Sequence, residues 1–115
     1  MKEIWYARPV FCVSDLNRSL DFYLGMLGFT KKWHEADGTG TVCQVDRSNC
    51  EIILAEEKER HDKARMFLEL DPEGLETFRR EVVERSIPHT MTWWGYNCIL
   101  LTDPDGNELL VSVEV

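Results

Sequence analysis

Residues 9–23 read PVFCVSDLNRSLDFY, and residues 65–79 read RMFLELDPEGLETFR. In both stretches an apolar, strand-like run leads to an aspartate, Asp15 or Asp71, and a phenylalanine follows seven residues later. The correspondence continues at an offset of 56–57 residues, because the turn signals at 46–49 and 103–106 also fall into register. One copy is too short to bury enough apolar surface alone, which predicts two modules that pack together or pair between chains.

Each copy predicts one strand, one helix and three further strands. In the first copy a strand is expected over 4–13, Ser14 or Asp15 caps the following helix, and Gly28 ends it. In the second copy Asp71 caps a helix that has Pro72 at its first position. The other strands are expected over 29–35, 41–46, 50–55, 64–70, 88–93, 97–102 and 108–114.

The predicted fold class is α+β, with two tandem βαβββ modules whose mixed sheets each curl around a concave face. The modules are expected over about residues 1–56 and 64–115, joined by the charged linker 56–63 within a single domain, 1–115. Alternation along the strands predicts which side chains point away from the helices. Arg8 and Arg65, and likewise Ile53 and Leu110, are expected at positions related by a pseudo-twofold axis.

Composition excludes several classes of function. The formal net charge is −8 and no basic stripe is visible, which argues against nucleic-acid binding and favours cationic ligands. No apolar run approaches the ~18–20 residues of a membrane span, and the N-terminus lacks the apolar core of a signal peptide. The four cysteines lack C-x-x-C spacing, which predicts reduced, buried thiols and a cytoplasmic protein.

The tryptophans are the strongest candidate binding residues. Trp33 follows two lysines, and the adjacent Trp93 and Trp94 should point to opposite faces of a strand, so that one of them faces the concave side. Packing in the core or at a dimer interface is one explanation for them. The alternative is an aromatic wall for a planar ligand, with a cation–π contribution of ~0.5–2 kcal/mol if that ligand is cationic.

The opening segment, residues 9–29, and the closing Asp-Pro-Asp-Gly-Asn-Glu-Leu segment, residues 103–109, resemble the vicinal-oxygen-chelate superfamily. This group includes glyoxalase I, extradiol dioxygenases and the fosfomycin- and bleomycin-resistance proteins. Pro9-Val10 and Trp94-Gly95 are similar to the bleomycin-resistance branch. The resemblance implies paired βαβββ modules in a homodimer whose clefts are shared between subunits.

Enzymes of that superfamily hold a divalent metal with one side chain from each first and last strand of the two modules. By position the resemblance carries these sites onto Arg8, Ile53 or a neighbour, Arg65 and Leu110. A guanidinium is not deprotonated in proteins and aliphatic side chains offer no lone pair, so none of the four can bind a metal. We therefore expect no metal, no cofactor and no catalytic residue.

The resulting hypothesis is a non-catalytic protein that binds and sequesters a small, aromatic, drug-like molecule of the bleomycin type, in the manner of antibiotic-resistance proteins. No nucleic acid or membrane partner is expected. Two alternatives remain: a metal-dependent lyase or dioxygenase of the glyoxalase type, with ligands relocated to Glu51, Glu108, Glu69 and His34, and a structural dimer without a ligand. The predicted ligand-binding residues are Arg8, Trp33, Cys43, Arg65, Phe67, Trp93, Trp94, Glu108 and Leu110.

Overall fold

The computed structural model describes residues 3, 5–60 and 62–114 of the chain. The chain forms two compact units, Met1–His61 and Asp62–Val115. The strands are β1 (Val10–Val13), β2 (Thr30–His34), β3 (Val42–Arg47), β4 (Cys50–Glu56), β5 (Arg65–Leu68), β6 (Thr90–Trp93), β7 (Asn97–Thr102) and β8 (Glu108–Ser112). The helical segments are α1 (Leu16–Leu20), η1 (Asp21–Met26), α2 (Glu35–Gly38) and α3 (Pro72–Glu84).

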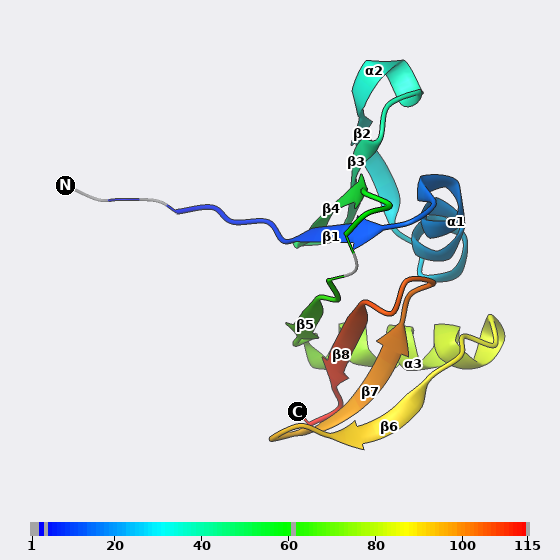
Figure 1. The fold of residues 1–115 in the computed structure, drawn as a ribbon. Helices are drawn as coiled ribbons and strands as arrows, with labels where there is room; N and C mark the ends of the chain where they lie inside the picture. Colours follow the sequence, from blue (N-terminus) through cyan, green and yellow to red (C-terminus); the bar gives the residue numbers. More distant parts are fainter. Residues whose placement is uncertain (1–2, 4, 61, 115) are drawn as a thin grey trace. The chain divides into compact units, whose positions relative to one another are not determined.

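Each unit contains one four-stranded sheet, ordered β1-β4-β3-β2 in the first unit and β5-β8-β7-β6 in the second (Figure 1). The pairs β1–β4 and β5–β8 are parallel, and the other neighbours are antiparallel. The registers also match, because Val10 lies opposite Ile53 in the first sheet and Phe67 lies opposite Leu110 in the second. The predicted α+β fold of two βαβββ modules with mixed sheets is confirmed.

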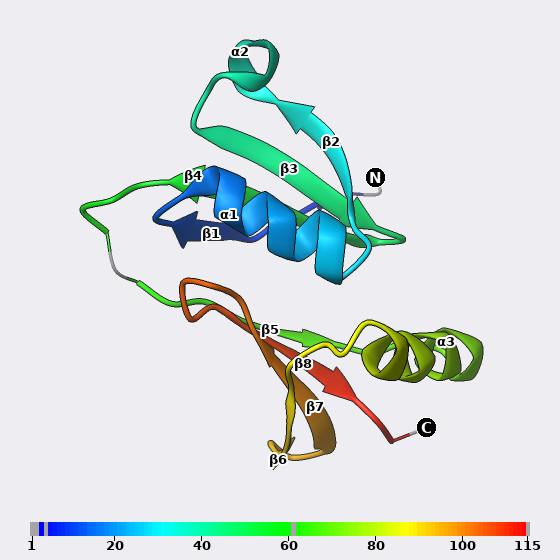
Figure 2. The same ribbon diagram turned by 90° about the vertical axis from the view of Figure 1, so that its right-hand side faces the viewer.

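A helix covers one face of the first sheet (Figure 2). The side chain of Asp15 accepts a hydrogen bond from the backbone N–H of Arg18 at 3.2 Å and caps α1, as predicted. The helix continues as the π-helical η1, and the Leu27 N–H donates to the Phe22 carbonyl at 3.0 Å. Gly28 follows with φ of 74°, a left-handed conformation that glycine adopts without strain.

The core of the first unit lies between this helix and the sheet. The ring of Tyr23 is fully buried and meets Phe29 edge-on, with 5.6 Å between ring centroids. Alternate side chains of three strands face the helix and are at most 2% exposed, namely Phe11, Val13, Cys43, Val45, Ile52 and Leu54. Burial of each large apolar side chain contributes about 1.5–3 kcal/mol. The opposite face of the sheet carries the intervening side chains.

The second unit is built in the same way around α3. Asp71 accepts a hydrogen bond from the Gly74 N–H at 2.7 Å, and Pro72 occupies the first turn, so this helix start is also as predicted. Figures 1 and 2 both place α3 on one side of the second sheet. The buried side chains of α3 are Leu75, Phe78 and Val82. The sheet face toward it is apolar and at most 3% exposed at Ile99, Leu101, Leu109 and Val111.

Several boundaries differ from the sequence expectation. The first strand begins only at Val10, and Ile4 of the expected strand lies outside the described residues. Pro9 has no N–H to donate, which limits strand pairing before β1. The short α2 lies between β2 and β3, begins at Glu35 within the strand expected over 29–35, and contains Ala36 and Asp37, both with φ of 51°. In the described part of the chain, no helix has the length and apolar character needed to cross a membrane.

Candidate functional site

Three aromatic side chains gather on the face of the second sheet that points away from α3. Phe67 comes from β5, and Trp94 and Tyr96 come from the turn between β6 and β7. The ring centroid of Phe67 lies 5.7 Å from that of Trp94 and 5.3 Å from that of Tyr96, with interplanar angles of 37° and 40°. We call these three residues the aromatic platform, because they offer ring faces on which a planar molecule can stack.

The turn between β6 and β7 positions the two outer rings. Gly95 has φ of 69°, and the Trp94 N–H donates to the Tyr96 carbonyl at 2.9 Å. Trp93 pairs with Asn97 on the last residue of β6, so it lies on the other face of the sheet from the platform. The structure therefore brings together Phe67 and Trp94 of the predicted residues and leaves Trp93 apart from them. Tyr96 was not predicted, although its position one residue past the Trp-Gly turn was a usable signal.

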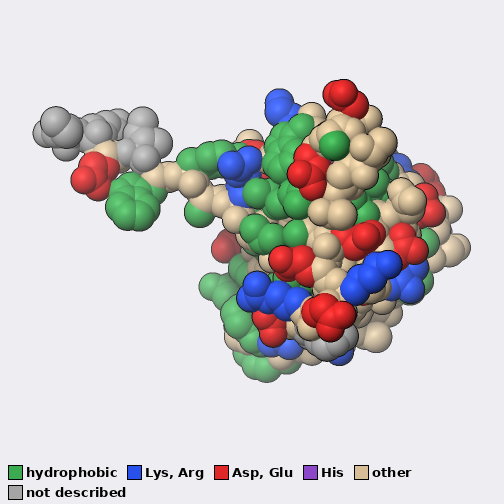
Figure 3. Space-filling view, turned by 45° about the horizontal axis from the view of Figure 1, so that its top comes forward, with side chains coloured by type: hydrophobic (Ala, Val, Ile, Leu, Met, Phe, Trp, Pro, Cys, Tyr) green, Lys and Arg blue, Asp and Glu red, His purple; other side chains and the backbone are tan. Residues whose placement is uncertain are grey.

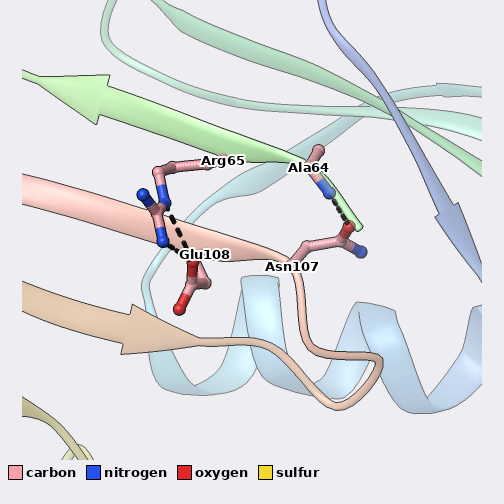
Figure 4. Close-up of polar contacts among 4 residues, drawn as sticks. All are labelled: Ala64, Arg65, Asn107 and Glu108. Carbon is pink, nitrogen blue, oxygen red and sulfur yellow. Dashed lines mark hydrogen bonds and ion pairs between the residues drawn. The ribbon is translucent and has the colours of Figure 1, made fainter. Parts of the chain in front are cut away.

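Arg65 and Glu108 form an ion pair on the same face of the second sheet (Figure 4). Arg65 donates from Nε to Glu108 Oε1 at 2.9 Å, and its Nη2 lies 2.8 Å from the same oxygen. These two predicted binding residues are thus each other's partners, and the charge of Arg65 is compensated locally. Leu110 is opposite Phe67 in the register and only 2% exposed, so it supports the platform from within the sheet.

The corresponding face of the first sheet carries a polar cluster centred on Gln44. This side chain is 2% exposed, and its Oε1 accepts hydrogen bonds from Arg8 Nη1 at 2.6 Å and Trp33 Nε1 at 2.9 Å. Its Nε2 donates to Asp46 Oδ1 at 2.8 Å and to Glu51 Oε1 at 2.9 Å. Both amide lone pairs and both amide hydrogens are used, which fixes the orientation of the amide group.

Two aromatic side chains flank this cluster. The hydroxyl of Tyr6 donates to Glu51, and this hydrogen bond raises the pKa of Tyr6. The guanidinium carbon of Arg8 lies 5.2 Å from the centre of the Tyr6 ring. Trp33 is 38% exposed, and its indole N–H is held by Gln44. The predicted residues Arg8 and Trp33 therefore meet at Gln44, to which both donate. Gln44 itself was not predicted, although a glutamine inside an apolar strand is an unusual signal.

Cys43 is placed differently from the prediction. It lies opposite Leu54 in the register and is fully buried on the helix side of the first sheet, so it lines the core rather than a binding surface. Burial raises the pKa of its thiol to about 11. The cause of the misplacement is the strand parity: Gln44, and not Cys43, shares the outer face with Ile53.

Three of the four positions that the resemblance assigns to metal ligands lie in the two sheets. Arg65 is engaged by Glu108, while Ile53 and Leu110 are aliphatic. The alternative of a relocated metal site needs His34 and Glu51 on one face. His34 lies opposite Cys43 in the register, on the helix side of the first sheet, whereas Glu51 lies on the other face. Among residues 3, 5–60 and 62–114, no group of three or more His, Cys, Asp or Glu side chains is arranged to hold a metal ion.

Charge is mixed on the face of the molecule drawn in Figure 3. On the face drawn in Figure 3, acidic and basic side chains lie among each other and among hydrophobic ones, rather than in a stripe of one sign. Acidic residues outnumber basic ones over the whole chain, 21 to 13. This distribution lacks the basic footprint of a nucleic-acid interface on that face.

Comparison with known proteins gives a family. The model of the Glyoxalase/Bleomycin resistance protein/Dioxygenase superfamily matches residues 5–111. No curated protein matches the chain. The family match covers the platform, the Gln44 cluster and both sheets up to Val111 of β8.

Solved structures share the fold at low identity. A bleomycin-binding protein in complex with bleomycin has a TM-score of 0.73 at 21% identity, over 96% of this chain and 100% of that one. The bleomycin-binding protein of Streptomyces verticillus, with copper(II)-bleomycin, has a TM-score of 0.70 at 20% identity, over 100% of both chains. A lactoylglutathione lyase from Agrobacterium tumefaciens has a TM-score of 0.69 at 16% identity, over 96% of this chain and 94% of that one. These similarities establish the fold.

Proposed function

This chain belongs to the Glyoxalase/Bleomycin resistance protein/Dioxygenase superfamily, and we propose that it is a non-catalytic binding protein that sequesters a small, planar, drug-like molecule. Bleomycin-type antibiotics are the ligand class to test first, because two structural neighbours are bleomycin-binding proteins. The protein would act as a homodimer, as the superfamily resemblance implies. No side chain is assigned a catalytic role.

The observation that carries this proposal is the aromatic platform. Trp94 and Tyr96 keep 48% and 46% of their surface exposed although both rings pack against Phe67. Large aromatic groups left half exposed on a sheet face still have apolar surface to bury. A planar ligand stacked on two of these rings would gain about 0.5–1.5 kcal/mol per ring contact in addition to the burial of its apolar area.

The electrostatics of the chain support a ligand that is neutral or positively charged. The net charge of −8 attracts cations at long range. Close to the platform, the ion pair with Glu108 compensates the positive charge of Arg65, so that this arginine does not repel a cation as an isolated guanidinium would. A cationic ring system over Trp94 would also gain a cation–π contribution of ~0.5–2 kcal/mol.

Isothermal titration calorimetry with metal-free bleomycin tests the proposal, with Trp93 as a matched control for Trp94. The two are adjacent, and both are exposed, at 68% and 48%. The Trp94→Ala variant should bind at least about tenfold more weakly, which is ~1.4 kcal/mol, whereas Trp93→Ala should stay within about twofold. Equal losses in both variants would refute the assignment of the platform.

The remaining outcomes separate the proposal from its competitors. If the wild-type protein binds neither bleomycin nor any member of a panel of planar aromatic compounds, sequestration is wrong. If the protein retains one equivalent of Zn²⁺, Ni²⁺, Mn²⁺ or Fe²⁺ after dialysis, the metal-dependent alternative replaces it. Light scattering should give twice the chain mass of 13.4 kDa if the proposed homodimer forms.

A further inference from the structure

The two units carry the same arginine and glutamate at equivalent positions but use them differently. Arg65 and Glu108 are opposite each other in the second sheet, and Arg8 and Glu51 precede them by 57 residues each. In the second unit the two side chains form a direct ion pair at 2.8 Å. In the first unit the hydrogen bond of the guanidinium goes to Gln44 Oε1 instead, at 2.6 Å.

Gln44 separates the two charges of the first unit. Its carbonyl oxygen faces Arg8 and Trp33, while its amide nitrogen faces the carboxylates of Asp46 and Glu51. A flipped amide would direct N–H groups at two donors and an oxygen at two carboxylates, so only one orientation is compatible with the neighbours. The side chain therefore acts as a neutral spacer between a cation and a pair of anions.

The second unit has a leucine at the position equivalent to Gln44. Gln44 lies opposite Ile53 in the first sheet, and Leu100 lies opposite Leu110, the equivalent of Ile53, in the second. Leucine has no polar atom with which to divide the charges, and there the arginine and glutamate meet directly. The difference between paired and separated charges thus coincides with a change from leucine to glutamine at one position on the third strand of the module.

The separated charges retain hydrogen-bonding capacity. Among the described residues, Gln44 is the only hydrogen-bond acceptor for the Arg8 side chain, so the other N–H groups of its guanidinium remain available. Within the same residues, the second carboxylate oxygens of Asp46 and Glu51 accept no protein hydrogen bond. Asp46 and Glu51 are directly opposite each other on neighbouring strands, where like charges repel and favour a cation between or beside them.

We propose that this face of the first unit is a site for a zwitterion, specifically the ammonium and carboxylate groups of an aromatic α-amino acid. The carboxylate would accept from Arg8, in the charge-assisted geometry for which guanidinium is suited. The ammonium would donate to Asp46 and Glu51, and the exposed rings of Tyr6 and Trp33 would contact the aromatic side chain. A simple anion meets two carboxylates here and a simple cation meets Arg8, so only a ligand with both charges satisfies the site.

This site lies in the first unit and goes beyond the platform function of the second. The test compares three probes with the same phenyl skeleton, namely L-phenylalanine, 3-phenylpropionate and 2-phenylethylamine, by calorimetry and by the indole N–H resonance of Trp33. L-Phenylalanine should bind and shift that resonance. The two probes with a single charge should bind at least about tenfold more weakly.

Three variants connect the binding to the separated charges. Gln44→Leu gives the first unit the residue type of the second, and it should weaken L-phenylalanine binding at least about tenfold. Arg8→Gln changes an exposed side chain and should have the same effect without disturbing the fold. Arg65→Gln, at the equivalent position of the second unit, is the control and should stay within about twofold.

Any of the following results would overturn the inference: no binding of L-phenylalanine up to its solubility limit, equal binding of the three probes, unchanged binding in the Arg8→Gln variant, or unchanged binding in a folded Gln44→Leu variant. The Trp94→Ala variant separates this site from the proposed function. It should bind bleomycin at least about tenfold more weakly and keep L-phenylalanine binding. If it loses L-phenylalanine binding instead, the amino acid binds to the platform and the zwitterion site is wrong.

Discussion

Replacement of Asn107 by alanine should be one of the most damaging single substitutions in the second unit. Asn107 is fully buried, its Oδ1 accepts from the Ala64 N–H at 2.8 Å, and its Nδ2 donates to Asp103 Oδ2 at 3.0 Å (Figure 4 shows the first contact). These bonds hold the segment entering β5 to the turn before β8. Asp103 is itself only 4% exposed, so little water can replace the lost donor.

The size of the stability loss follows from the side-chain hydrogen bonds that Asn107 makes to Ala64 and to Asp103. Each hydrogen bond lost from a buried or half-buried group costs about 1–3 kcal/mol, so the loss of the bonds to Ala64 and Asp103 should lower the free energy of unfolding by about 3 kcal/mol in Asn107→Ala. For a chain of this size the melting temperature should fall on the order of 10 °C. Chemical and thermal denaturation followed by circular dichroism measures both quantities.

The matched control is Asn49→Ala, at an exposed position of the turn between β3 and β4. Its effect should stay within about 0.5 kcal/mol. If Asn107→Ala is as mild as Asn49→Ala, the hydrogen bonds of Asn107 do not hold this turn, and the reasoning is refuted.

Two further predictions concern a helix cap and a thiol. Asp71→Ala removes the acceptor for the Gly74 N–H at 2.7 Å and should cost about 1 kcal/mol in urea denaturation, while a loss below the experimental error would contradict the capping role. Burial raises the pKa of the Cys50 thiol to about 11, so the thiolate is scarce in the folded protein at neutral pH. Its reaction with iodoacetamide, followed by peptide mass spectrometry, should therefore stay slow until the pH approaches that value. In urea the reaction should accelerate near pH 8.5. Fast labelling of the folded protein at neutral pH would contradict the raised pKa of this half-buried thiol.

The order of helices and strands could be predicted because the same pattern of residues occurs in both halves of the sequence. Asp15 and Asp71 each precede a helix-period apolar pattern and each accepts from a backbone N–H three residues later. Gly28 follows the first helix with a positive φ, which glycine adopts without strain. These signals are local, so a single sequence carries them.

The π-helical continuation of the first helix was not predictable in this way. The side chains of η1 have a spacing compatible with an ordinary α-helix, and the wider turn appears only in the backbone hydrogen bond from Leu27 to Phe22. Tyr23, within η1, is fully buried in the core, and such packing is a tertiary effect that a local sequence pattern does not carry.

The candidate sites were predicted less well, for reasons of strand parity and distance in sequence. In β3 the run Val42-Cys43-Gln44-Val45 is mostly apolar, so alternation does not reveal which face of the strand is buried. For this reason the prediction that Cys43 lies on the outer face is wrong. The contacts of Gln44 span 36 residues to Arg8 and 11 to Trp33. The sequence predicts Phe67 and Trp94 as binding residues, but their convergence with Tyr96 depends on the shape of the β6–β7 turn.

The most direct test of the central claim uses the indole N–H resonances of the tryptophans in a ¹H–¹⁵N spectrum. On titration with metal-free bleomycin, the resonance of Trp94, which packs against Phe67 with 5.7 Å between ring centroids, should shift or broaden with a saturable dependence on ligand. The resonance of Trp93, on the other face of the sheet, should stay in place. If Trp93 shifts and Trp94 does not, the platform is not the binding surface, and the proposed function loses the observation that supports it.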